Sequence, residues 1–140
     1  MARYNRINLD GKSDTKAGLV TAITLPGTFL RYNAGTAKFV AATSATLLQK
    51  YYVANGFAES VSAADAIPAD GSVNAEVLSS NRELALLVAA SQTVVIDSPL
   101  TITAAGQVKV ATGVEVVVAF ASEALTTGAG VTNLIKAVMA

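Results

Sequence analysis

Short β-forming segments, each closed by a turn signal, restrict the fold of this 140-residue chain more than any other feature. From residue 19 onward, runs rich in Val, Ile, Leu, Thr and aromatic residues end at dipeptides such as Pro26-Gly27, Asn55-Gly56 and Thr112-Gly113. Such runs are short for helices and are typical of strands joined by tight turns. We therefore predict a mainly β, single-domain protein with a small β-sandwich or barrel-like body.

Two hairpins are predicted from apolar segments that flank a glycine-containing loop. Residues 29–32 and 38–41 flank the loop Asn33-Ala34-Gly35-Thr36, and residues 100–103 and 108–111 flank a loop with Gly106. Glycine in such loops supplies the positive φ that tight turns need. Further strands are predicted at residues 19–23, 47–54, 73–77, 94–96, 114–121 and 131–138. The sequence shows no repeat at a fixed period.

The run at residues 82–90, RELALLVAA, fits two interpretations. Ser80 or Asn81 could cap a helix that carries Glu83 in its first turn. The run is short, however, and predicted strands flank it on both sides. We therefore predict a strand.

The surface of this protein carries unusually little charge. Apolar residues make up 52% of the sequence and charged residues 14%, whereas an average soluble domain has about 25% charged residues. A surface of Ala, Thr, Ser, Val and Gly is better suited to burial against partner proteins than to exposure on a free monomer. The alternative is a compact, Ala-rich globule whose surface has no partner.

Charge is distributed unevenly along the chain. Residues 1–40 carry six cations and two anions, and the remaining residues carry four cations and eight anions. We interpret residues 1–18 as an extended basic N-terminal arm and residues 19–140 as a slightly acidic β-rich domain. A frayed terminus is the alternative.

The predicted arm places apolar side chains among cations. A segment of this kind can pair its backbone with the strand edge of a partner while its cations meet acidic patches. The candidate binding residues are Arg3, Tyr4, Arg6, Ile7, Leu9, Lys12 and Lys16.

The residue types that carry most catalytic and metal chemistry are missing from the sequence. There is no histidine, cysteine or tryptophan, so the common nucleophile–base pairs and zinc ligand sets cannot form. We predict no enzyme activity, no catalytic residues, no cofactor and no metal. A net charge of zero argues against a nucleic-acid partner, and no apolar run reaches the ~18 residues of a membrane span.

The order of segments resembles a known family. PGTFLRYNAGTAKFVAA is followed by YYVANGFAESVSAADAIPADGSVNAEVL, then LALLVAASQTVVIDSPLTITAAGQVKVATG and VEVVVAFASEALTT. Ala90-Ser91-Gln92-Thr93 matches a turn of the family, with Ser91 where glycine is usual. Asp97-Ser98-Pro99-Leu100 matches its corner, and Ala119, Ala121 and Glu123 match its closing strand. Over roughly residues 26–125 the chain resembles the capsid decoration (cement, head-stabilising) proteins of tailed phages.

This resemblance implies a structural virion protein. It would be made in the host cytoplasm, bind the major capsid protein on the outer surface of the icosahedral head, and cement neighbouring capsomers against internal DNA pressure. The resemblance favours a homotrimer over a homodimer and a body of the β-clip or β-tulip type. It implies no catalytic residues.

Two alternatives remain open. Low charge and high β content also suit another self-assembling phage subunit, such as a tail-tube or fibre protein. A small carbohydrate- or ligand-binding β-module is the third hypothesis, although the sequence offers no convergent polar cluster for a ligand.

Overall fold

The computed structural model describes residues 4, 6–12, 14–47, 49–55 and 65–140. These residues form strands and turns and no helix, which confirms the predicted mainly β fold. The strands are β1 (Thr15–Leu19), β2 (Phe29–Asn33), β3 (Lys38–Ala41), β4 (Tyr52–Val53), β5 (Ser72–Val77), β6 (Glu83–Val88), β7 (Thr93–Val94), β8 (Pro99–Ile102), β9 (Val108–Val110), β10 (Ala119–Ala121), β11 (Leu125–Thr126) and β12 (Asn133–Met139).

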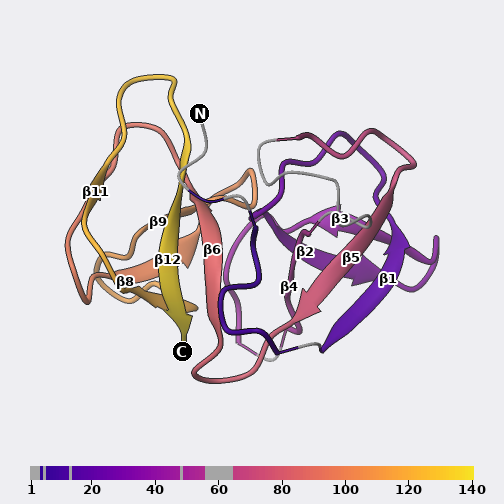
Figure 1. Cartoon of the computed structure of the whole chain (residues 1–140), viewed down its shortest axis with the longest axis horizontal. Coiled ribbons are helices and arrows are strands. Elements are labelled where there is room, and N and C mark those ends of the chain that lie inside the picture. Colours follow the sequence, from indigo (N-terminus) through magenta and orange to yellow (C-terminus); the bar gives the residue numbers. More distant parts are fainter. Residues whose placement is uncertain (1–3, 5, 13, 48, 56–64) are drawn as a thin grey trace.

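The strands form two lobes that lie side by side (Figure 1). The N-terminal lobe is a five-stranded sheet in the order β1-β5-β4-β2-β3. A parallel bridge between Val20 and Phe39 brings its two edges together, and the Thr21 N–H donates to the Phe39 carbonyl at 3.1 Å. The C-terminal lobe is a closed barrel, β10-β12-β6-β9-β8, with a small β7–β11 ladder beside it.

The two lobes share one topology. In each lobe, taken in chain order, the first strand pairs with the fifth, the fifth with the fourth, the fourth with the second and the second with the third, all antiparallel. The third strand also pairs in parallel with the first. In the C-terminal lobe this pairing joins the two strands themselves, and in the N-terminal lobe it joins the third strand to Val20, the residue directly after the first strand. In the C-terminal lobe these five strands are β6, β8, β9, β10 and β12. The β7–β11 ladder also has a counterpart, the bridge between Thr24 and Ile67.

The registers of the two lobes also coincide. Val20 pairs with Phe39, and their counterparts Val88 and Val108 pair in the same way. Buried core residues occupy matching positions in both lobes: Val20 and Val88, Leu30 and Leu100, Phe39 and Val108, Tyr52 and Ala119, Ala54 and Ala121, Val73 and Ile135, Ala75 and Ala137. The fold therefore uses one five-stranded unit twice.

Loop lengths explain why the sequence shows no fixed period. Val73 and its counterpart Ile135 are 62 residues apart, whereas Leu30 and Leu100 are 70 residues apart. The spacing drifts because the loops of the two lobes differ in length, while the strand registers are kept. Side-chain identities also differ at most matched positions, so only the pairing pattern shows the repetition.

The lobes are joined by an apolar contact. Phe29 and Val53, on the outer face of the N-terminal lobe, are fully buried and belong to the same hydrophobic core as the barrel. The corner at Gly27 lies on strand β6, where its carbonyl accepts the Leu87 N–H at 3.1 Å. The Gly27 backbone has φ +92°, which glycine adopts at little cost.

Gly27→Ala tests how tightly this corner is packed. A Cβ at this position would lie 2.7 Å from Leu134 Cδ2 and 3.0 Å from the Leu87 nitrogen. We expect a loss of about 2–4 kcal/mol in the free energy of unfolding, measured by urea denaturation. Gly113→Ala is the matched control, because Gly113 also has positive φ, +59°, but no atom lies within 4 Å of the added Cβ. Equal losses in the two variants would show that packing at the corner contributes nothing.

Four predicted strands differ from the structure. The strand predicted at residues 19–23 lies four residues earlier, as β1, and the one predicted at 94–96 keeps only Val94, in β7. The segments predicted at 47–54 and 114–121 keep only β4 and β10. Val114 is fully exposed, so its apolar side chain marks a loop and not a buried strand. The ambiguous run at 82–90 is a strand, β6, as predicted.

Candidate interaction surfaces

The described part of the predicted arm packs against the body. Ile7 is fully buried in the barrel core, and its carbonyl accepts the Ala85 N–H at 2.8 Å. The Leu9 N–H donates to the Glu83 carbonyl at 3.2 Å, and the Leu9 side chain packs against the same core. Ile7 and Leu9 are therefore committed to strand β6 and cannot anchor a partner while this packing holds.

The other predicted arm residues occupy different surroundings. The Tyr4 hydroxyl donates to Glu123 at 2.5 Å, and Lys16 lies within β1, with Nζ 3.7 Å from the Tyr32 ring centre. Because Lys16 belongs to a strand of the N-terminal lobe, the boundary predicted between residues 18 and 19 falls inside that strand. Arg6 and Lys12 are exposed, and Arg3 lies outside the described residues.

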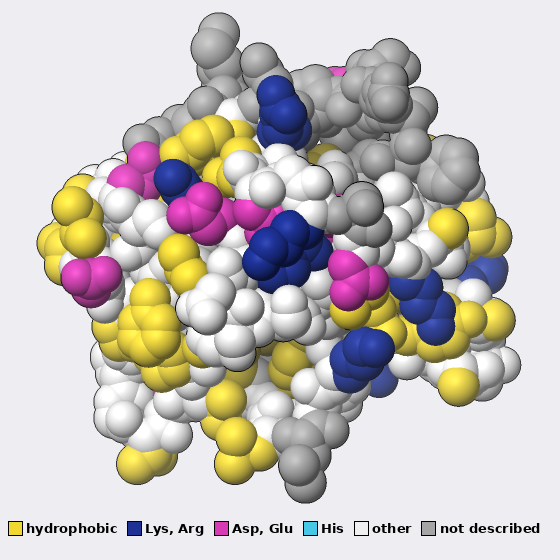
Figure 2. All heavy atoms as spheres, turned by 60° about the horizontal axis from the view of Figure 1, so that its bottom comes forward, with side chains coloured by type: hydrophobic (Ala, Val, Ile, Leu, Met, Phe, Trp, Pro, Cys, Tyr) yellow, Lys and Arg dark blue, Asp and Glu magenta, His cyan; other side chains and the backbone are white. Residues whose placement is uncertain are grey.

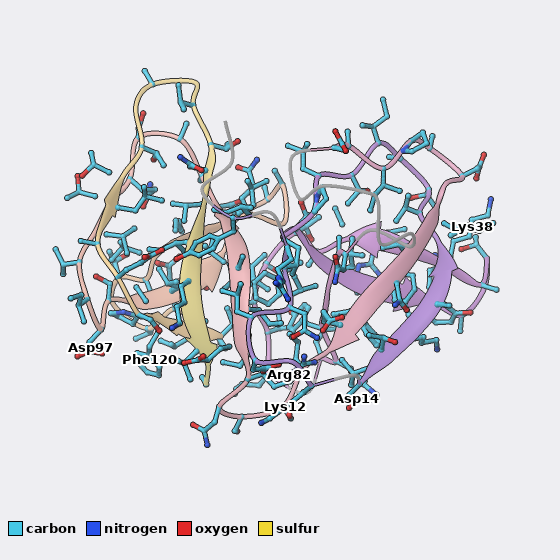
Figure 3. The ribbon with its side chains drawn as sticks, in the orientation of Figure 1. Lys12, Asp14, Lys38, Arg82, Asp97 and Phe120 are labelled. Carbon is cyan, nitrogen blue, oxygen red and sulfur yellow. The ribbon has the colours of Figure 1, made fainter. Side chains whose placement is uncertain are left out.

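A buried ion cluster joins the N-terminal segment to both lobes. The Arg82 side chain, 1% exposed, lies just before β6 and donates from Nη2 to Glu76 on β5 at 2.9 Å. Its Nε and Nη2 donate to the two carboxylate oxygens of Asp10 at 3.3 and 3.2 Å. Nη2 also donates to the Lys12 carbonyl, and Nη1 donates to the Asp14 and Val77 carbonyls. Figure 3 shows Arg82 and Lys12 close together where the two lobes meet.

The sequence alone does not reveal this cluster. Glu76 alternates with Val73, Ala75 and Val77, a pattern that predicts a solvent-facing carboxylate, yet Glu76 is 1% exposed. Its burial is permitted because Arg82 supplies the opposite charge and the Asn8 side-chain amide donates a second hydrogen bond at 2.9 Å. Glu76 lies 6 positions from Arg82, but Asp10 lies 72 positions from it, and only the three-dimensional structure brings the three side chains together.

The ion cluster lowers the pKa of Asp10. Burial alone would raise this pKa, but hydrogen bonds from Arg82 and from the Lys12 and Glu83 N–H groups outweigh burial and hold it at about 2. In the opposite direction, Asp10 and Glu76 outweigh the effect of burial on Arg82 and raise the pKa of its guanidinium.

The Asp10 pKa predicts a loss of stability in acid. The folded-state pKa of Asp10 lies below the ordinary aspartate pKa of 3.8, so the stability that the carboxylate contributes is fully present above about pH 4 and is lost as pH falls through about 2. We expect Asp10→Asn to remove on the order of 2 kcal/mol at pH 7 and little at pH 2. Urea denaturation across this pH range measures the difference. A loss from Asp10→Asn that is as large at pH 2 as at pH 7 would contradict the prediction.

Exposed apolar side chains lie at both ends of the molecule (Figure 2). At the end formed by the C-terminal lobe, Val95, Ile96 and Phe120 are 58%, 62% and 43% exposed. At the opposite end, Leu19 on β1 is 38% exposed. Single exposed apolar side chains are common on soluble proteins, and they indicate a protein–protein contact only where they lie together.

Two hollows flank the C-terminal residue Ala140. One, of about 400 Å³, lies between the lobes and is bordered by Phe29, Tyr51 and Val118. The other, of about 520 Å³, lies on the barrel beside Asp97 and Phe120. The described residues include no group of three acidic, histidine or cysteine side chains that could hold a metal ion. No helix in the described part of the chain is long and apolar enough to cross a membrane.

Comparison with known proteins gives a match at the level of structure. No family model and no curated protein matches the chain. Among solved structures, the fold is similar to the head fibre gp8.5 N base of bacteriophage phi29, with a TM-score of 0.58. The alignment covers 90% of this chain and 92% of that chain at 14% identity. At this level of identity, the two chains share a fold.

Proposed function

We propose that this chain is a structural protein of a phage virion that binds the outer surface of the head. The observation that carries the proposal is the common fold with the phi29 head fibre base, which extends over nearly the whole of both chains. The resemblance of its turns and corner to capsid decoration proteins and its low surface charge support the same role.

The partner in this proposal is the major capsid protein. Many weak contacts, one for each copy on the lattice, would together cement neighbouring capsomers through avidity and stabilise the head. The exposed cations of the N-terminal segment, Arg6 and Lys12, remain candidates for capsid contact, together with Lys16. The proposed role is non-enzymatic and needs no cofactor, and we propose a homotrimer as the bound form.

Co-sedimentation tests the head-binding role. Purified protein is mixed with heads of the phage whose genome carries the gene, and with tails separated from the same particles. We expect the protein to sediment with heads and to saturate at a fixed number of copies per head. Binding to tails alone would favour the second candidate, a tail-tube or tail-fibre subunit, and binding to neither would overturn the proposal.

A separate measurement tests the cementing role. Heads that carry the protein should release DNA at a higher temperature than heads stripped of it. Identical release temperatures with bound protein would reduce the role to decoration or to supporting a fibre. The words "head fiber" in the name of the phi29 protein favour that fibre-base role as the alternative.

A further inference from the structure

In the contact between the two lobes, a corner of the N-terminal lobe packs on a strand of the C-terminal lobe. The C-terminal lobe has a matching corner and the N-terminal lobe has a matching strand, and both are uncovered, one at each end of the molecule. In the N-terminal lobe, a corner at residues 26–29 and the adjacent Val53 pack on strand β6. The matching positions in the C-terminal lobe are the corner at residues 96–99 and Phe120. These matching positions face away from the N-terminal lobe (Figures 1 and 3).

The two corners have the same backbone structure. The Gly27 N–H donates to the Ala54 carbonyl at 2.9 Å, and the Asp97 N–H donates to the matching Ala121 carbonyl at 2.8 Å. Both residues have positive φ, +92° and +67°. A further turn bond, from Thr28 to Leu25, recurs from Ser98 to Val95. The second corner therefore has the shape that the first corner uses on β6. One bond of that contact, from the Phe29 N–H to the Gly106 carbonyl at 2.8 Å, has no counterpart, because Pro99 takes the place of Phe29 and has no N–H.

The two corners differ in whether they are covered. Pro26 and Gly27 are buried, and Phe29 and Val53 are 0% exposed, because the barrel lies on them. The matching side chains carry exposed surface, and they are Ile96, Asp97, Pro99 and Phe120. Ile96 and Phe120 thus expose apolar surface to solvent, whereas their counterparts Pro26 and Val53 are buried.

The surface that would receive this corner is also present and open. In the lobe contact, the Gly27 corner lies against Ala85, Leu87 and Leu134, all buried. Their counterparts in the N-terminal lobe are Ala17, Leu19 and Ser72, all exposed. Strand β1 lies at the end of the molecule opposite β8 (Figure 1), and Asp97 and Phe120 lie opposite Lys38 (Figure 3).

We propose that the chain associates head to tail with a second copy of itself, the 96–99 corner and Phe120 of one copy docking on β1 of the next. The contact repeats the one between the lobes: the Asp97 carbonyl accepts the Leu19 N–H, as the Gly27 carbonyl accepts the Leu87 N–H. Such a heterologous contact builds a closed ring when its rotation closes and a filament when it does not.

Side-chain size supports this pairing. In the lobe contact, glycine at position 27 faces the large Leu134, and a Cβ there would lie 2.7 Å from Leu134 Cδ2. In the proposed contact, the larger Asp97 faces the smaller Ser72. The smaller Ser72 removes the nearest obstacle to a Cβ in this corner. The Leu19 nitrogen takes the place of the Leu87 nitrogen, which lies 3.0 Å from a Cβ built at Gly27, so the Asp97 corner docks slightly further from β1 than the Gly27 corner lies from β6. The Ser72 hydroxyl can donate to the Asp97 carboxylate.

Complementary surface variants test the proposal in solution. Leu19→Glu and Phe120→Glu each damage one of the two surfaces, and Val114→Glu is the control because Val114 is fully exposed and lies on neither. By sedimentation velocity we expect oligomers for the wild type and the control, and at least about tenfold weaker association for each variant alone. An equimolar mixture of the two variants should form dimers and stop there, since one intact pair of surfaces remains.

Disulfide trapping gives a second readout. The chain has no cysteine, so Asp97→Cys and Ser72→Cys introduce single thiols. Mixed under mild oxidation, the two variants should form a cross-linked heterodimer in preference to either homodimer. Circular dichroism establishes that each variant is folded. A wild type that stays monomeric at its highest soluble concentration, or oligomers that survive both glutamate substitutions, would overturn the proposal. These outcomes are independent of head binding.

Discussion

Arg82→Ala is expected to lower the free energy of unfolding by about 3–5 kcal/mol. Removing the guanidinium leaves Glu76, 1% exposed, without its opposite charge and deprives Asp10 of two hydrogen bonds. It also leaves the Val77 carbonyl without the donor that Arg82 supplies at 2.8 Å. Urea denaturation of the purified variant at pH 7 measures the loss.

Two further variants show whether buried charge is the cause. Arg31→Ala removes an exposed cation from β2 and should change the stability by less than about 0.5 kcal/mol. Adding Glu76→Gln to Arg82→Ala should restore part of the loss, because a neutral amide is less costly to bury than an unpaired carboxylate. A double variant no more stable than Arg82→Ala would argue that Arg82 acts through packing alone.

Ile7→Ala is expected to cost about 2–5 kcal/mol. Ile7 is 0% exposed and lies in the barrel core beside β6, so truncation leaves a cavity that the surrounding strands fill only in part. If residues 1–18 were instead an idle tail, the variant would be as stable as the wild type. Thermal or urea denaturation distinguishes these outcomes.

The matched control for Ile7 is Ile23→Ala. Ile23 is 74% exposed, so the same chemical change should cost less than about 0.5 kcal/mol there. A loss at Ile23 as large as at Ile7 would contradict the assignment of Ile7 to the core.

Because Ile7 packs in the barrel core, removing residues 2–16 should unfold the barrel. Loss of capsid binding by such a truncation would therefore not identify a binding arm.

Hairpins could be predicted well because local signals specify them. The predicted bounds of strand β3, Lys38–Ala41, match the structure, since the glycine-containing loop before it is a signal that acts over only a few residues. Strand β1 was misplaced because its residues are mainly polar or small and only alternate ones are partly covered. An edge strand of this kind lacks the alternation of large apolar and polar residues that predicts a half-buried strand.

The candidate surfaces were harder to predict than the strands. The sequence shows the basic N-terminal segment, but Ile7 and Leu9 in that segment pack in the core. No local pattern distinguishes an apolar residue that binds a partner from one that packs on its own domain. The Arg82 cluster depends on pairing between distant residues. The two five-stranded units share the way their strands pair. This pairing cannot be recognised in the sequence, because the loop lengths and most side chains differ between the two units.

The packing of Ile7 on β6 also sets an order of events during synthesis. Its partner Ala85 is made 78 residues later, so at about 5–20 residues per second the N-terminal segment waits several seconds for its strand. Residues 15–77 can meanwhile pair among themselves. The barrel therefore closes last, around a segment made first, and a chaperone that shields Ile7 and Leu9 on the ribosome would act in this interval.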